Sequence, residues 1–234
     1  MCHLIAALLL FVAFANCSWG ETVDTGKTDA NSGAGAKGDI SKENTVSKEA
    51  FLQKMGNSEP YWAMKRSYED ITISNQKKVC ISTERTQQTK GNEDVIFLQK
   101  YKLEGCEWFT TTHDARYNVT FTDTPGVGAG LSITMTPIDY TDILQEKTYS
   151  VLFWNPDEGC FVFKLQTSEG ADKCELLAWD KEASVGAQYQ SCEASYKTCS
   201  HTEGHQLFSE SCRTNHTIMM QRMKENPELI ATCM

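Results

Sequence analysis

The stretch that decides the fold is Cys160-Phe161-Val162-Phe163-Lys164-Leu165, followed by Cys174-Glu175-Leu176-Leu177-Ala178-Trp179 and later by Cys192. Both six-residue segments alternate in the way that predicts β-strands. The alternation places Glu175 on one face with Leu177 and Trp179, and it gives Phe161 and Phe163 a common face on the preceding strand. A single carboxylate among aromatic side chains, next to cysteines, predicts a pocket for a small ligand rather than a catalytic site.

Short strands separated by turn residues continue on the N-terminal side of this stretch. The eight predicted strands are Val79–Thr83, Val95–Lys102, Glu107–Asp114, Tyr117–Phe121, Leu131–Met135, Thr148–Trp154, Cys160–Leu165 and Cys174–Trp179. Such a series indicates an all-β sandwich or an up-and-down barrel. In Thr148–Trp154 both faces carry apolar residues, so parity alone does not decide which face is buried.

Helical patterns flank the strands. Ser47 is a candidate N-cap for a helix with Ala50, Phe51 and Met55 at helical spacing. The segment 60–64 predicts a second short helix or a turn, and 192–199 predicts a helix with cysteines at both ends.

The N-terminus has the pattern of an export signal. Leu4–Phe14 is an apolar run of signal-peptide length and is too short to span a bilayer. We expect residues 1–20 to be a signal peptide cleaved after Gly20, with cleavage after Cys17 as the alternative. Residues 21–46 have almost no large apolar side chain and predict a disordered leader. The domain is then expected at 47–213, with a C-terminal tail at 214–234 in a secreted, extracellular and monomeric protein.

Cysteine usage and charge agree with an exported binding protein. Outside the predicted signal peptide there are eight cysteines, which predicts four disulfides and no metal site: Cys80, Cys106, Cys160, Cys174, Cys192, Cys199, Cys212 and Cys233. Asn118 and Asn215 begin glycosylation sequons. The net charge of −9 and the scattered basic residues argue against nucleic acid binding. Neither a catalytic set of residues nor a cofactor motif is apparent, so we expect no enzyme activity.

The order of these parts resembles the tick salivary lipocalins, the histamine-binding family. The family signature is Cys-Asp-aliphatic, a short gap, Glu-Leu-aromatic, a longer gap and a cysteine. In this sequence it reads Cys160-Phe161-Val162, Glu175-Leu176-Leu177 and Cys192, with Phe161 in place of the acid and Leu177 in place of the aromatic residue. The resemblance implies an eight-stranded antiparallel lipocalin barrel with an N-terminal and a C-terminal helix, stapled by disulfides.

The resemblance also implies two disulfides, Cys80–Cys212 and Cys160–Cys192. For the other four cysteines we favour Cys174–Cys199 and Cys106–Cys233, because these pairs keep the helix on the eighth strand and the tail on a hairpin end. Sequence alone leaves that connectivity open.

Within the implied barrel, Glu175 matches a carboxylate that contacts amines in the family, and Trp62 matches an aromatic residue that closes the barrel base. Phe161 and Ser150 stand where relatives carry acids, and Glu59 is a candidate replacement for the acidic companion of Trp62. The expected ligand-binding residues are Glu175, Trp62, Phe97, Tyr101, Ser150, Trp154, Phe161, Phe163 and Trp179.

The resemblance implies that the protein sequesters small host mediators without turnover, with histamine or serotonin as the first expectation. A leukotriene or fatty acid is the alternative in the same barrel, because an aromatic side chain replaces an expected acid at Phe161. A protein-binding inhibitor of host complement or haemostasis, acting through loops and the tail, is the hypothesis from a different class. If Glu175 is paired with an Arg or Lys, its role is structural.

Overall fold

The computed structural model describes residues 46–56, 59–72, 75–86, 95–124, 130–139, 145–168, 170 and 172–233. The predicted signal peptide and nearly all of the predicted leader lie outside these residues. In the part of the chain that is described, no helix has the length and apolarity needed to cross a membrane.

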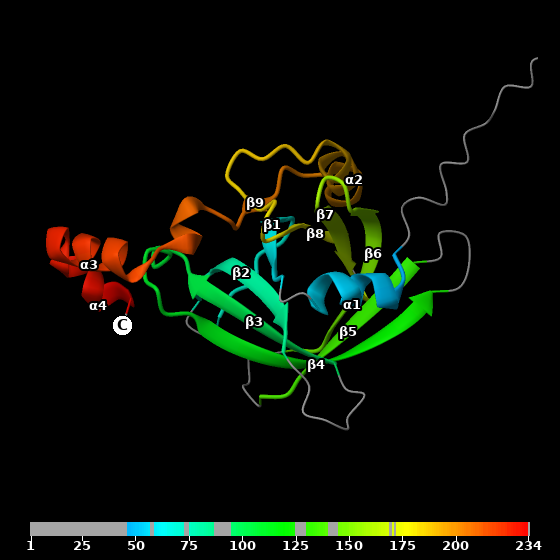
Figure 1. The fold of residues 1–234 in the computed structure, drawn as a ribbon, viewed down its shortest axis with the longest axis horizontal. Helices are drawn as coiled ribbons and strands as arrows, with labels where there is room; N and C mark the ends of the chain where they lie inside the picture. The colour runs from blue at the N-terminus through cyan, green and yellow to red at the C-terminus, as the bar shows by residue number, and fades with distance from the viewer. Residues whose placement is uncertain are drawn as a thin grey trace, which may run out of the picture. The chain divides into compact units, whose positions relative to one another are not determined.

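The elements follow the chain in the order shown in Figure 1. The strands are β1 (Tyr61–Arg66), β2 (Lys78–Arg85), β3 (Val95–Leu103), β4 (His113–Thr124), β5 (Gly130–Pro137), β6 (Lys147–Asn155), β7 (Cys160–Leu165), β8 (Lys173–Trp179) and β9 (His205–Gln206). The α-helices are α1 (Lys48–Gly56), α2 (Gln190–Ser200), α3 (His216–Glu225) and α4 (Ile230–Cys233), with 3-10 turns at Glu210–Arg213 and Pro227–Leu229.

The strands close into an antiparallel barrel. Consecutive strands pair from β2 to β8, and β1 pairs with both β8 and β2, which closes the ring of eight. The short β9 adds to β1 outside this ring. Closure leaves no free edge among the eight strands. The predicted all-β, eight-stranded lipocalin barrel with flanking helices is confirmed.

The first strand corrects a prediction. The segment 60–64 was expected to be a helix or turn, but residues 61–66 form β1. Its backbone groups are satisfied by β8 on one side and by β2 and β9 on the other. This pairing is a tertiary effect, and six residues have too little local pattern to reveal it.

A second correction concerns the predicted strand Glu107–Asp114. Residues 106–112 form turns and bends, and β4 begins at His113 and includes the predicted strand Tyr117–Phe121. Trp108 and Phe109 are consecutive buried residues, so they do not alternate as strand residues would. They belong to a small separate core with Met219 and Met223 from α3.

Strand alternation separates two larger cores. One fills the barrel and contains Phe97, Phe161, Phe163, Leu177 and Trp179. The other lies between the barrel wall and α2 and contains Val162, Leu176 and Tyr196. In β6 a register shift between Val151 and Phe153 resolves the ambiguity left by parity, because Tyr149, Val151 and Trp154 join the barrel core while Leu152 is exposed.

Four disulfides hold the accessory segments on the barrel: Cys80–Cys212, Cys106–Cys233, Cys160–Cys192 and Cys174–Cys199. These are the pairs that the sequence analysis favoured. Two of them attach α2 to β7 and β8, and the other two attach the C-terminal segment to β2 and to the turn after β3. In α3, Met219 and Met223 pack against the small core around Trp108, whereas Ile218 and Met220 are exposed.

A buried lysine joins the C-terminal segment to the barrel. Lys102 at the end of β3 is 4% exposed. Its Nζ donates to the carbonyl oxygens of Glu107 at 2.7 Å and of Ser211 and Cys212 at 3.2 Å each. Hydrogen bonds from a charged donor are stronger than those from a neutral one, so these three bonds hold the C-terminal segment firmly on the barrel.

We therefore expect Lys102→Met to lower the free energy of unfolding by about 2–4 kcal/mol, because three carbonyl groups lose their donor. The matched control is Lys100→Met on the same strand. Lys100 pairs with Glu84 at the surface, and both side chains are about a third exposed, so its loss should change stability by less than about 1 kcal/mol. Urea unfolding measures both, and equal effects would contradict the special role of Lys102.

Candidate functional site

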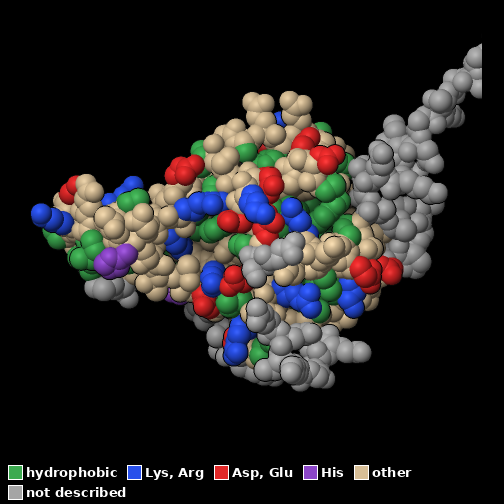
Figure 2. Space-filling view, in the orientation of Figure 1, with side chains coloured by type: hydrophobic (Ala, Val, Ile, Leu, Met, Phe, Trp, Pro, Cys, Tyr) green, Lys and Arg blue, Asp and Glu red, His purple; other side chains and the backbone are tan. Residues whose placement is uncertain are grey.

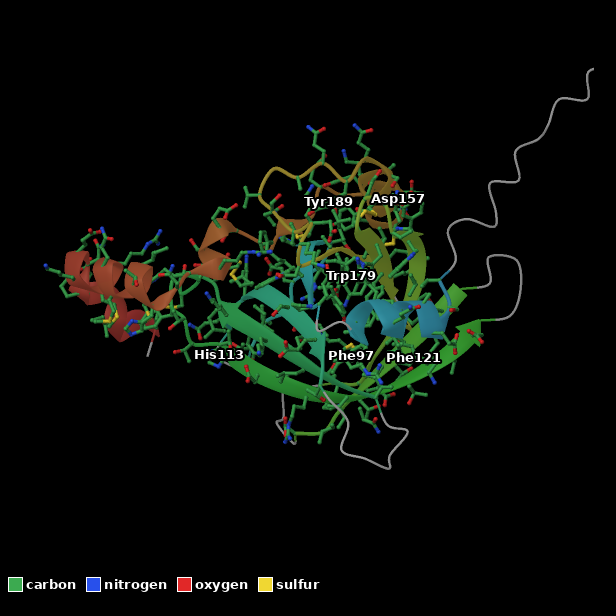
Figure 3. The ribbon with its side chains drawn as sticks, in the orientation of Figure 1. Phe97, His113, Phe121, Asp157, Trp179 and Tyr189 are labelled. Carbon is green, nitrogen blue, oxygen red and sulfur yellow. A yellow bond between two sulfur atoms is a disulfide. The ribbon has the colours of Figure 1, made fainter. Side chains whose placement is uncertain are left out.

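One end of the barrel interior is aromatic. The ring of Phe51, from α1, lies 5.7–6.3 Å from six other rings: Tyr61, Phe121, Trp154, Phe161, Phe163 and Trp179. We call the space enclosed by these six rings the aromatic chamber. Figure 3 labels Phe121 and Trp179, which both contact the Phe51 ring of α1. Ser47 caps the helix that carries Phe51, because its Oγ accepts from the Ala50 N–H at 3.2 Å.

The other end of the interior is ionic. β1 runs from Tyr61, which pairs with Trp179 in the aromatic chamber, to Arg66, which pairs with Glu175. Arg66 Nε lies 3.1 Å from Glu175 Oε1. This contact is an ion pair whose angle does not make a hydrogen bond. The Tyr68 hydroxyl donates to the same carboxylate oxygen, and the Arg66 guanidinium also stacks 4.9 Å from the Tyr68 ring centre.

Asp70 joins three cations at this end. It lies 2.8 Å from Lys147 Nζ, 3.4 Å from an Arg66 guanidinium nitrogen and 3.5 Å from Lys78 Nζ. We call the group Arg66, Asp70, Lys78, Lys147 and Glu175 the ion cluster. Arg66, Lys78 and Glu175 are each less than 5% exposed.

The pKa shifts reflect this arrangement. Burial alone would raise the pKa of Asp70, but Lys147, Arg66 and Lys78 outweigh it and lower the pKa to about 2. Burial also opposes the charge on Arg66, but Glu175 and the neighbouring groups raise its pKa well above the usual value. Burial raises the pKa of the Tyr68 and Tyr149 hydroxyls, which therefore stay neutral donors.

Little space remains between the two ends. The central cavity has a volume of about 10 Å³ and is lined by Thr83, Gln99, Tyr149, Glu175 and other inward side chains. That is room for about one water molecule. A larger cleft of about 240 Å³ lies outside the ion cluster, and Tyr68, Asp70 and Lys78 form part of its wall. A ligand inside the barrel therefore has to displace side chains from one of the two closed ends.

Six of the nine predicted ligand-binding residues are brought together in the barrel interior. Phe97, Trp154, Phe161, Phe163 and Trp179 belong to the barrel core, and Glu175 lines the central cavity. Tyr101 is buried near the ion cluster, where Lys78 Nζ lies 4.9 Å from its ring centre.

Two predicted residues lie outside the interior. Trp62 alternates with Tyr61 and Ala63 on β1 and points outward, where its Nε1 donates to Asp180 at 2.6 Å and its ring packs on Phe208. Ser150 also faces outward, and its Oγ accepts from Gln166 at 2.9 Å. Strand parity explains why both side chains point outward. The sequence did not reveal this parity, because β6 contains a register shift and β1 was predicted to be a helix or turn.

Sequence reasoning missed the residues that change the chemistry of Glu175. Arg66 lay next to the segment read as a helix or turn, and Tyr68 and Asp70 lie in the irregular segment after β1. Recognition of β1 as a strand beside β8 would have placed Arg66 opposite Glu175. Glu59, proposed as an acidic companion of Trp62, is buried, with its Oε2 3.7 Å from Lys54 Nζ.

Among the described residues, one group of His, Cys, Asp or Glu side chains lies close enough together to hold a metal ion, namely Glu158, Cys160 and Cys192. Its two cysteines form a disulfide with each other. On the face shown in Figure 2, Lys and Arg side chains are interspersed with Asp and Glu.

An eight-stranded antiparallel barrel with a core inside it and a helix stapled to its wall is a lipocalin fold, a class that binds small molecules within the barrel. The chain belongs to the tick histamine-binding protein family, whose model matches residues 40–214. The fold and the family together support small-ligand binding as its activity.

The chain was also compared with solved structures and with curated protein sequences. Among solved structures, the chain is similar to japanin from Rhipicephalus appendiculatus bound to cholesterol. The two chains are 16% identical, with a TM-score of 0.43, over 61% of this chain and 87% of japanin. A search of curated protein sequences gave no match.

The low pKa of Asp70 gives a prediction for stability against pH. Because its folded-state pKa lies below its ordinary value, the contribution of Asp70 is fully present above about pH 4 and is lost as the pH falls through about 2. A shift of this size corresponds to about 2 kcal/mol. We expect Asp70→Asn to be less stable than the wild type by about that amount or more at pH 7, and the difference to shrink from pH 4 to pH 2.

The control for Asp70 is Asp172→Asn. Asp172 forms a surface ion pair with Lys164 in which both side chains are more than a third exposed, so its loss should matter little at any pH. Urea unfolding at several pH values makes the comparison. An Asp70→Asn deficit that persists unchanged at pH 2 would contradict the assignment.

Proposed function

We propose that this chain is a secreted, monomeric salivary lipocalin that sequesters a small host mediator in its barrel, and that the mediator is an amphipathic acid such as a fatty acid or leukotriene. The observation that carries the choice of an acid is the ion pair between Arg66 and Glu175, the residue expected to bind an amine. The carboxylate already has a buried cation and the Tyr68 hydroxyl as partners.

The charges of the ion cluster favour an anionic head group. At their formal charges, the three cations Arg66, Lys78 and Lys147 outnumber the two carboxylates Asp70 and Glu175. A bound carboxylate would balance this excess, whereas a bound ammonium group would add to it. Uncompensated charge is costly where water is largely excluded.

The rest of the barrel suits the apolar part of such a ligand. The interior beyond the ion cluster is built mainly from apolar and aromatic side chains, including Phe97, Ile133 and Phe163, which are at most 2% exposed. The cleft beside Tyr68 and Asp70 provides a polar approach to the cationic end.

A biogenic amine is the second candidate. Glu175 is 4% exposed, and Tyr149, Phe163 and Leu177 line the same cavity, which is an environment that could hold an aryl amine if Arg66 moved away. A protein-binding inhibitor, the third hypothesis, would instead contact its partner through the tail, where Ile218 and Met220 are exposed.

The secretory route also predicts glycosylation. Asn118 on β4 and Asn215 before α3 are both exposed. Asn215 caps α3 through its Oδ1, which accepts from the Ile218 N–H at 3.0 Å, so its amide nitrogen is not used for capping. We expect the mass of protein secreted from insect cells to fall on deglycosylation, and Asn118→Gln and Asn215→Gln should each remove one glycan. Unchanged mass would contradict this part of the proposal.

The ligand class is tested by calorimetric titration of the delipidated protein with oleate, leukotrienes, serotonin and histamine. Arg66→Gln should lose affinity for the acids by roughly tenfold or more, because one charge-assisted bond is removed, and it should gain affinity for serotonin. Glu175→Gln should keep or improve acid binding, because Arg66 is then released from its internal partner.

The matched control is Lys65→Gln. Lys65 is on the same strand but points outward and pairs with Glu193 of α2 at 2.7 Å, so its replacement should leave all affinities unchanged. Amine binding that is lost in Glu175→Gln, together with no acid binding by the wild type, would reverse the assignment. Thermal unfolding of each variant separates loss of binding from loss of folding.

A further inference from the structure

The aromatic chamber holds a side chain from outside the barrel wall. Phe51 is fully buried and contacts the six rings of the chamber, yet it belongs to α1 rather than to a strand. Its contacts are stacked with Phe163 and edge-on with Phe161, which are the geometries that aromatic pairs prefer. The chamber is thus built around an aromatic ring.

Polar contacts contribute little to the attachment of α1 to the described part of the barrel. Among the described residues, no hydrogen bond or disulfide joins α1 to a strand. Lys54 lies 3.7 Å from Glu59 and 5.7 Å from the ring centre of Trp179, and Lys48 lies 5.8 Å from that of Phe121. Apolar burial of Phe51 and Met55 is therefore the main force that holds the helix in place.

The chamber wall also contains an unused hydrogen-bond donor. The indole Nε1 of Trp179 is buried and has no hydrogen-bond partner among the described residues, and the whole side chain is 0% exposed. A buried N–H without an acceptor is unfavourable. Phe51 cannot supply an acceptor, whereas an aromatic ligand that carries an oxygen or another acceptor could.

From these observations we infer that the aromatic chamber is a binding site for the apolar part of a ligand, and that Phe51 occupies it as an internal competitor. A ligand that enters the chamber expels Phe51, so that binding of the ligand and docking of α1 exclude each other. The central cavity of about 10 Å³ is too small to accept an aryl group while Phe51 remains. This inference rests on the proposed ligand-binding function of the barrel and adds the place where the apolar part of an acid, or an aryl group, would bind.

The wild-type protein gives the decisive test. We expect saturation with the fluorescent aryl sulfonate 1-anilinonaphthalene-8-sulfonate to increase hydrogen exchange in residues 48–56 while strands of the barrel stay protected. Ordinary binding next to a fixed helix would make the same amides more protected. Increased protection of α1, or no change at saturation, would overturn the inference.

Two variants test the competition itself. Phe51→Ala and Met55→Ala both weaken α1 docking and should bind the probe about tenfold or more tightly, since an internal competitor reduces apparent affinity by the fraction of open molecules. Phe51→Ala also creates a cavity in the aromatic chamber that could by itself increase affinity for the probe. Met55→Ala keeps the Phe51 ring and is therefore the stricter test of competition. Gln53→Ala, at an exposed position of the same helix, should bind as the wild type does.

The outcomes separate this inference from the proposed function. If the wild type binds oleate while neither Met55→Ala nor Phe51→Ala gains affinity for the probe, the competition is wrong and the proposed function stands. If no form of the protein binds oleate, amines or the probe, the proposed function itself has failed.

Discussion

The structure depends on the way β1 closes the barrel. β1 lies between β8 and β2, and its register places Arg66 opposite Glu175. The resulting buried ion pair balances the charge of a carboxylate in the interior, where the loss of either charged partner is strongly destabilising. The same register places Tyr61 beside Trp179. Barrel closure, the ionic end and the aromatic end therefore follow from one set of strand pairings.

The two ends are closed by different kinds of force. At the ionic end, Tyr68 and Asp70 from the segment after β1 are held by directional contacts with Arg66, Lys78 and Glu175. At the aromatic end, Phe51 is held by non-directional burial. A ligand with a charge of the right sign can replace the ionic contacts, and a ligand with apolar surface can replace Phe51. An amphipathic ligand can do both.

Disulfides determine where the accessory segments lie but leave the interior free. All eight bonded cysteines are outside the barrel core, on its wall, in the turn after β3, on α2 or in the C-terminal segment. The helices α3 and α4 are attached through Cys233 of α4 and the Met219 contacts of α3, and both lie beyond the residues that match the family model. Changes of ligand preference in such a barrel therefore need not disturb the covalent framework.

The sequence by itself determined the strands β2 to β8, the capped helix at Ser47 and the helix between Cys192 and Cys199, because each carries a strong local period. It predicted a further strand at Glu107–Asp114, where residues 107–112 are not part of a strand. It also placed Glu175, Phe161, Phe163 and Trp179 on the faces that form the interior. Parity failed at β1 and β6, where short length and a register shift hide which side chains point inward. Only the tertiary structure decided that Arg66 neutralises Glu175 and that Phe51 fills the aromatic chamber. The physical reason is that charge pairing and cavity filling bring together residues that are mostly far apart in the sequence, and no local pattern reports the distance between them in space.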